Sequence, residues 1–106
     1  MQDTHSPKDV ARECLRDVDP MWKAFWFHMH LVAKNLEEFS EGLAHISDEV
    51  FAYHISGQKN DFAKWVREVI SDGVLARELD NVTSKEEAAE VAAKRVAELK
   101  RTLAVE

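Results

Sequence analysis

Cysteine and glycine are both scarce in this chain, and each scarcity excludes a class of protein. Cys14 is the single cysteine, so no disulfide can form within the chain, which excludes a secreted scaffold held by disulfides. The three glycines stand at positions 42, 57 and 73, and none lies in a G-x-G-x-x-G, G-x-x-x-x-G-K-[ST] or G-x-S-x-G motif. The chain therefore lacks the glycine-rich loops that hold phosphate groups in nucleotide-binding proteins.

Long apolar runs and an excess of basic charge are also missing. No stretch approaches the roughly 18 to 20 apolar residues that a membrane span needs, and the opening MQDTHSPKDV is not typical of a secretory signal. The 14 Lys and Arg residues stand against 20 Asp and Glu residues, and the formal net charge of −6 repels a nucleic-acid backbone. We therefore expect a cytoplasmic protein that does not contact a membrane and whose main partner is not nucleic acid.

The residues that are present predict one folded domain. The 106 residues are 45% hydrophobic and 32% charged, which is an ordinary balance for a globular protein and enough for one core. We interpret residues 1–106 as a single helical domain without internal repeats.

N-cap residues followed by apolar residues at three- and four-residue spacing predict most of the secondary structure. Ser6 precedes Pro7, and Asn35 forms a capping-box pattern with Glu38. Gly73 suits the left-handed residue that ends a helix. The predicted helices cover residues 7–19, 35–46, 47–56, 60–72 and 84–103, with one or two further turns at 74–79.

The aromatic segment 21–32 fits two periods. As a strand it places Phe25 and Phe27 on one side and Trp26 and His28 on the other. As a helix it places Trp22, Phe25, Trp26, Met29 and Ala33 in one stripe. Periodicity does not decide between them, and the aromatic content favours the strand.

The last predicted helix, about 84–103, is rich in alanine and carries an apolar seam. Its seam residues alternate three- and four-residue steps, which is the spacing of a coiled coil: Ala89, Ala92, Val96, Leu99 and Leu103. Only about two heptads are present, so packing within the domain is favoured over a partner helix. Residues 91–101 contain four basic residues and residues 35–50 contain five acidic ones. Such runs are most often solvated helix faces, and opposed acidic and basic faces also suit self-association.

About half of the chain, residues 25–79, resembles an uncharacterised family of small prokaryotic domains, a domain of unknown function. The resemblance depends on a YH-x5-NDFxxWVxxVIxDxxLA signature, formed here by Tyr53-His54, Asn60-Asp61-Phe62, Trp65-Val66, Val69-Ile70, Asp72 and Leu75-Ala76. Upstream, Phe25, Phe27 and Leu36-Glu37-Glu38-Phe39 look like the same family's opening. The family implies an aromatic strand and turn before a helix, and it implies no activity. Where it usually has a glycine turn this chain has His28-Met29-His30, which leaves open one long helix from Met21 to Leu43.

Three histidines and one carboxylate are the candidate metal ligands. His28, His30 and His54, with the Asp61 carboxylate, are side chains that zinc or iron prefers, so a metal- or haem-binding helical protein is the alternative hypothesis. No predicted helix has two such ligands at i, i+3 or i+4 spacing, and we expect His54 and Asp61 to be structural. Cys14 lies on the apolar side of the first helix, where a thiol stays protonated and inert.

The sequence therefore predicts a mostly α protein, a compact bundle of four or five helices, with a short β-hairpin near residues 24–34 if the strand interpretation holds. The expected core is Trp26, Phe39, Phe51, Phe62, Trp65 and Val69. We expect a non-catalytic protein-interaction or self-association module without a cofactor, a homodimer that uses its last helix or its aromatic segment. Nucleic-acid association through the basic last helix is a further alternative.

Overall fold

The computed structural model describes residues 6–104 and confirms the mostly α fold class with a short hairpin. In chain order the elements are α1 (Pro7–Leu15), a 3-10 helix η1 (Met21–Lys23), β1 (Phe25–His28), β2 (Leu31–Ala33), α2 (Leu36–His45), α3 (Asp48–His54), β3 (Ile55–Ser56), β4 (Lys59–Asn60), α4 (Asp61–Trp65), a π-helix η2 (Val66–Ile70), α5 (Gly73–Leu79) and α6 (Lys85–Ala104). The described residues thus hold six α-helices, because the predicted helix at 74–79 forms as α5.

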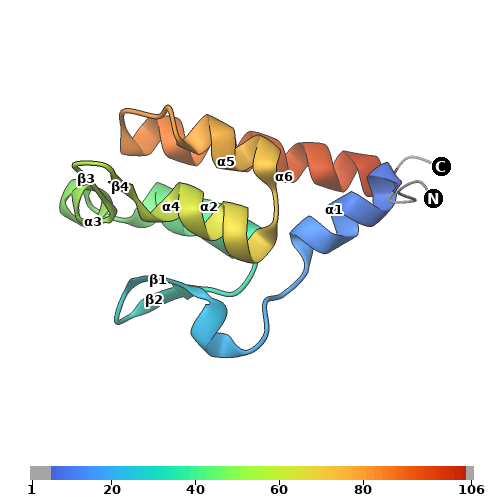
Figure 1. Cartoon of the computed structure of the whole chain (residues 1–106), viewed down its shortest axis with the longest axis horizontal. Helices are drawn as coiled ribbons and strands as arrows, with labels where there is room; N and C mark the ends of the chain where they lie inside the picture. The colour runs from blue at the N-terminus through green and yellow to red at the C-terminus, as the bar shows by residue number, and fades with distance from the viewer. Residues whose placement is uncertain (1–5, 105–106) are drawn as a thin grey trace.

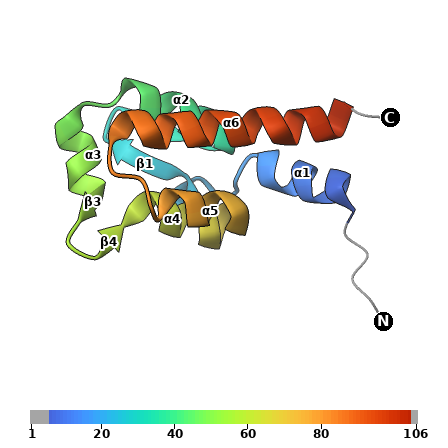
Figure 2. The same cartoon turned by 90° about the horizontal axis from the view of Figure 1, so that it is seen from above.

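The longest helix, α6, organises the packing. It lies along α2 and α1 (Figure 1, Figure 2). α5 packs against both α6 and α4. The β1–β2 hairpin lies below these helices, next to α2 and α3 (Figure 1). Within residues 6–104 no helix is both long enough and apolar enough to span a membrane.

The hairpin settles the ambiguity of the aromatic segment in favour of strands. β1 and β2 are antiparallel, with Trp26 opposite Val32 and a bulge between Trp26 and His28. The turn forms without glycine because the His28 Nδ1 atom accepts a hydrogen bond from the His30 backbone N–H at 3.2 Å. No residue of this turn has a positive φ. The single long helix considered for 21–43 is therefore wrong.

Side-chain caps begin the helices where the sequence predicts. The Ser6 hydroxyl accepts from the Asp9 N–H, the Asn35 amide oxygen from the Glu38 N–H, and the Ser47 hydroxyl from the Val50 N–H. Each bond satisfies one of the amides that a helix start leaves without a partner. Asn60 caps α4, where its amide oxygen accepts from the Ala63 N–H.

Two predicted helix ends are wrong. α1 ends at Leu15 and not at residue 19, because the chain then turns and the Val18 N–H donates to the Lys34 carbonyl beside β2 at 2.7 Å. Gly73 is the first residue of α5, and the left-handed residue is Ser71, with φ of 71°. There the N–H of Ser71 donates to the Val66 carbonyl at 2.8 Å, which closes the π-helical turn.

The core is an aromatic cluster centred on Phe25. Its ring centroid lies 5.3 Å from Phe39, 5.3 Å from Phe62 and 5.7 Å from Trp65. Phe39, Phe62 and Trp65 are buried as predicted, whereas Phe51 and Val69 are half-buried. The prediction that Trp26 is in the core is wrong, because it points outward from a strand whose other face carries Phe25 and Phe27.

A buried ion pair joins the start of α5 to α6. The Arg95 guanidinium donates to both carboxylate oxygens of Asp72, at 2.8 and 3.2 Å, and the Asp72 side chain is 2% exposed. Asp72 also caps α5 by accepting from the Leu75 N–H. Because a buried charge without its partner is strongly destabilising, this pair fixes α5 against α6.

Gly42 allows α2 to approach the hairpin. A Cβ atom at this position would lie 2.4 Å from the Phe27 ring, a distance at which something must shift. The Phe27 ring is 3% exposed and stacks on Phe39, so it has little room to move. The absence of a side chain at Gly42 therefore sets the distance between α2 and β1.

We expect Gly42→Ala to lower the free energy of unfolding by about 1 to 3 kcal/mol, since overpacking outweighs the roughly 1 kcal/mol gain in helix propensity. Gly73→Ala is the matched control, because its Cβ would meet only the Arg77 guanidinium at 3.8 Å. Urea unfolding followed by circular dichroism measures both. A Gly42→Ala variant as stable as Gly73→Ala would contradict the proposed close contact.

Candidate functional site

Alternation along β1 decides which aromatic side chains reach the surface. Phe25 and Phe27 point into the core and are 5% and 3% exposed. Trp26 lies between them on the opposite face and is 51% exposed, because successive side chains of a strand point to opposite sides. Burial of the two phenylalanines therefore forces the tryptophan into solvent.

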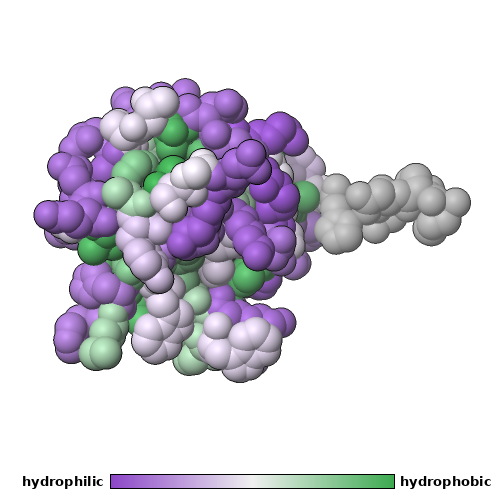
Figure 3. Space-filling view, turned by 60° about the vertical axis from the view of Figure 1, so that its left-hand side comes forward, coloured by the Kyte–Doolittle hydropathy of each residue, from purple (hydrophilic) through white to green (hydrophobic). Residues whose placement is uncertain are grey.

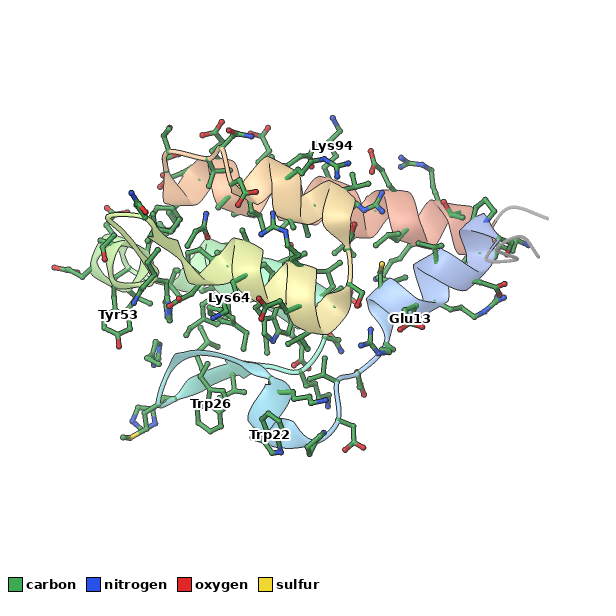
Figure 4. The ribbon with its side chains drawn as sticks, viewed as in Figure 1. Glu13, Trp22, Trp26, Tyr53, Lys64 and Lys94 are labelled. Carbon is green, nitrogen blue, oxygen red and sulfur yellow. The ribbon has the colours of Figure 1, made fainter. Side chains whose placement is uncertain are left out.

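Several large apolar side chains surround Trp26 on the outside of the domain. Trp22 is 75% exposed, Met29 78% and Tyr53 68%. We call these three residues and Trp26 the aromatic face. Figure 4 shows Tyr53, Trp26 and Trp22 in that order along one side of the molecule, all pointing away from the helices. In Figure 3, light-green and pale atoms gather along the lower edge, where Figure 1 places the hairpin.

A groove of about 480 Å³ opens in this face between the hairpin and α3. The residues that line it are mainly apolar, and they include the buried Phe27 and His54. Among the described residues, Glu49 is the one carboxylate that lines it. The remaining lining residues are Trp26, His28, Met29, Val50 and Tyr53.

His54 connects the elements that form the groove. This histidine ends α3, is 5% exposed, and both of its ring nitrogens are engaged. The Nε2 atom lies 2.9 Å from the Phe27 carbonyl of β1, and the Nδ1 atom lies 2.8 Å from the Asp61 carboxylate at the start of α4. One imidazole therefore ties the hairpin, α3 and α4 together.

The two partners of His54 are both acceptors. A neutral imidazole carries one N–H and donates to one of them, whereas the doubly protonated ring donates to both. The Lys59 ammonium group lies 3.5 Å from the same Asp61 oxygen and 4.5 Å from the Tyr53 ring centroid. His54 thus contacts a carbonyl and a carboxylate, and Asp61 contacts His54 and Lys59.

A second buried hydrogen bond holds the other end of the hairpin. The Trp65 indole Nε1–H donates to the Lys23 carbonyl at 2.7 Å. Since Lys23 ends η1 next to β1, this bond and the His54 bond attach the segment 23–27 at both ends. The aromatic face is consequently presented on a backbone with a fixed shape.

The three histidines proposed as metal ligands do not converge. His28 and His30 are exposed at the hairpin turn, where their ring centroids lie 6.4 Å apart. His54 is buried below, and neither of its nitrogens is available. Within residues 6–104 no three His, Cys, Asp or Glu side chains lie close enough to hold a metal ion together.

The apolar seam of α6 faces the core of its own domain. Ala92, Val96 and Leu99 are buried, at 0%, 7% and 4% exposure, while Ala89 and Leu103 are partly buried against the same core. α2 and α1 cover the seam. This is the outcome that the short heptad run favours.

The charged faces expected from the sequence partly neutralise each other within the molecule. Lys100 donates to the Glu37 carboxylate at 2.7 Å, and Arg95 is engaged with Asp72. Lys94 and Arg101 are exposed. Of the four basic residues between positions 91 and 101, Arg95 and Lys100 are thus held in ion pairs within the molecule.

Cys14 is buried, as expected for a structural thiol. Burial raises the pKa of the Cys14 thiol to about 11, so that it stays protonated near neutral pH. A protonated thiol is a poor nucleophile. The thiol therefore packs as a small apolar side chain.

Comparison with known proteins finds no match: no protein-family model, no curated protein and no solved structure matches the chain. The resemblance to a family of uncharacterised prokaryotic domains stays a prediction.

His54→Ala removes both hydrogen bonds and leaves the Phe27 carbonyl without a partner in the core. We expect it to lower the free energy of unfolding by about 2 to 4 kcal/mol. Tyr53→Ala is the control at the neighbouring exposed position and should change stability by less than about 1 kcal/mol. Urea unfolding measures both, and equal effects would refute the structural role of His54.

Proposed function

We propose that this chain is a non-catalytic protein-interaction module and that its contact surface is the aromatic face. The observation that carries this proposal is the exposure of Trp22, Trp26, Met29 and Tyr53 on one side of the domain. Exposed aromatic patches of this kind are uncommon on monomeric proteins and mark interaction sites. Tryptophan and tyrosine are also the residues that most often dominate binding energy.

The attachment of the hairpin supports the same function. The His54 and Trp65 hydrogen bonds fix the backbone on which Trp26 is presented. A surface that is already ordered loses less conformational entropy on binding than a flexible loop does. The aromatic face therefore has the rigidity of a prepared binding surface.

The exposed side chains are not needed for the core. Phe25, Phe39, Phe62 and Trp65 already fill it, and a polar residue at position 26 would leave these contacts intact. A large apolar residue exposed without a structural role is best explained by a partner that covers it. We place this module in the cytoplasm, in keeping with its single, reduced cysteine.

Photo-cross-linking in the native cells tests the proposal. The photoreactive residue p-benzoylphenylalanine replaces Trp26 in one variant and Lys94 in the control, since Lys94 lies on the opposite side of the molecule (Figure 4). We expect one discrete covalent adduct from position 26 and none from position 94, with the mass of the adduct read by mass spectrometry. Position 26 giving no adduct above the control, in a variant whose circular dichroism is unchanged, would refute the proposal.

A further inference from the structure

The turn of the β1–β2 hairpin carries three consecutive side chains that bind soft metal ions. His28 ends β1, and Met29 and His30 form the turn that leads to β2. All three side chains are exposed to solvent. Imidazole nitrogen and thioether sulfur are donors that suit copper(I), whereas calcium and magnesium take oxygen ligands.

The two imidazoles of the turn lie at a distance that one ion can bridge. Their ring centroids are 6.4 Å apart. Two imidazoles that bind one ion from opposite sides have their centroids roughly 6 Å apart, because a metal–nitrogen bond is about 2.0 Å long and the ring centre lies about 1 Å beyond the nitrogen. Linear binding by two nitrogens is a common geometry for copper(I), so this pair needs little rearrangement.

The third donor and an aromatic ring lie beside the same pair. Met29 lines the groove of about 480 Å³ together with His28 and Trp26, so its thioether is on the same side of the turn as the His28 imidazole. Trp26 and His28 share the outer face of β1, whose pattern of exposure alternates along the strand. The indole ring attracts a monovalent cation, and the apolar side chains around it reduce contact with water.

We propose that this turn binds one copper(I) ion through the imidazoles of His28 and His30 and the thioether of Met29. The site adds a metal ligand to the domain and does not depend on the proposed protein partner. The His28 Nδ1 atom accepts a hydrogen bond from the His30 N–H at 3.2 Å, and coordination by the His28 ring gives up this bond. Since 3.2 Å is the long limit for such a bond, a metal–nitrogen bond readily replaces it.

The donor set distinguishes copper(I) from zinc. Zinc sites in proteins use three or four His, Cys, Asp or Glu ligands, and residues 6–104 bring no three such side chains together. A cysteine thiolate is the strongest competitor for copper(I), but Cys14 is 1% exposed and burial raises the pKa of its thiol to about 11. The folded chain therefore offers copper(I) the hairpin turn in preference to its cysteine.

Competition with the copper(I) chelator ferrozine tests the proposal, in the absence of oxygen and with ascorbate to keep the copper monovalent. We expect the wild-type chain to withdraw one equivalent of copper(I). His28→Ala, His30→Ala and Met29→Ala should each weaken binding by about tenfold or more, because the loss of even an outer partner of a metal ligand costs about 10- to 100-fold. His45→Ala is the matched control, since His45 is an exposed histidine on α2, outside the turn.

X-ray absorption at the copper edge identifies the ligands directly. We expect two nitrogen donors and one sulfur donor in the wild-type chain, and no sulfur donor in Met29→Ala. The changed side chains are exposed, so each variant should keep the circular dichroism of the wild type. A wild-type chain that withdraws no copper from ferrozine would overturn the proposal. So would His45→Ala weakening the binding as much as His28→Ala does, or a sulfur donor that remains in Met29→Ala.

Discussion

The imidazole of His54 lies between oxygen atoms of two separate elements, and the position of the aromatic face depends on it. A two-stranded hairpin is marginally stable by itself, so β1 and β2 need attachment to the helices. Phe25 and Phe27 supply the apolar part of that attachment, but apolar packing alone is not directional. The hydrogen bond from His54 to the Phe27 carbonyl fixes the height of the strand above α3, and the contact with Asp61 fixes the ring itself. His54 lines the groove and also holds Phe27, which lines the groove as well.

The close packing of β1 against α2 is a second constraint on the hairpin. The Phe27 ring occupies the space that a side chain at position 42 would fill, which brings the strand against the helix axis. The inner side of the hairpin is thus held by close contact and the outer side is left to solvent. This asymmetry explains why Trp26 remains exposed in a chain whose described core residues are tightly packed. Folding uses the inner face, and the outer face is available for binding.

Most helix starts could be predicted from the sequence, because a cap is a local interaction. Ser6, Asn35 and Ser47 bond to amides three residues away, and these bonds depend on little else. Helix ends were harder to predict because they depend on distant partners. Residues 69–73 reverse direction where Arg16 donates to the Val69 carbonyl at 2.7 Å and Arg95 engages Asp72. These contacts hold Ser71 in a left-handed conformation that propensity assigns to the glycine two residues later.

The sequence predicted part of the candidate site. The strand interpretation of residues 25–28 already separated Trp26 from Phe25 and Phe27, but it could not say which side would be covered, and the prediction that Trp26 is buried followed from aromatic content alone. Which face is inside is decided by the helices that pack on it, and those contacts join residues 27 and 54 or 23 and 65. The α6 seam was predicted with the opposite result. Its coiled-coil spacing is compatible with a partner helix, but α1 and α2 of the same chain cover it. An apolar pattern therefore indicates that a surface will be covered, while only the fold determines whether the cover comes from the same chain.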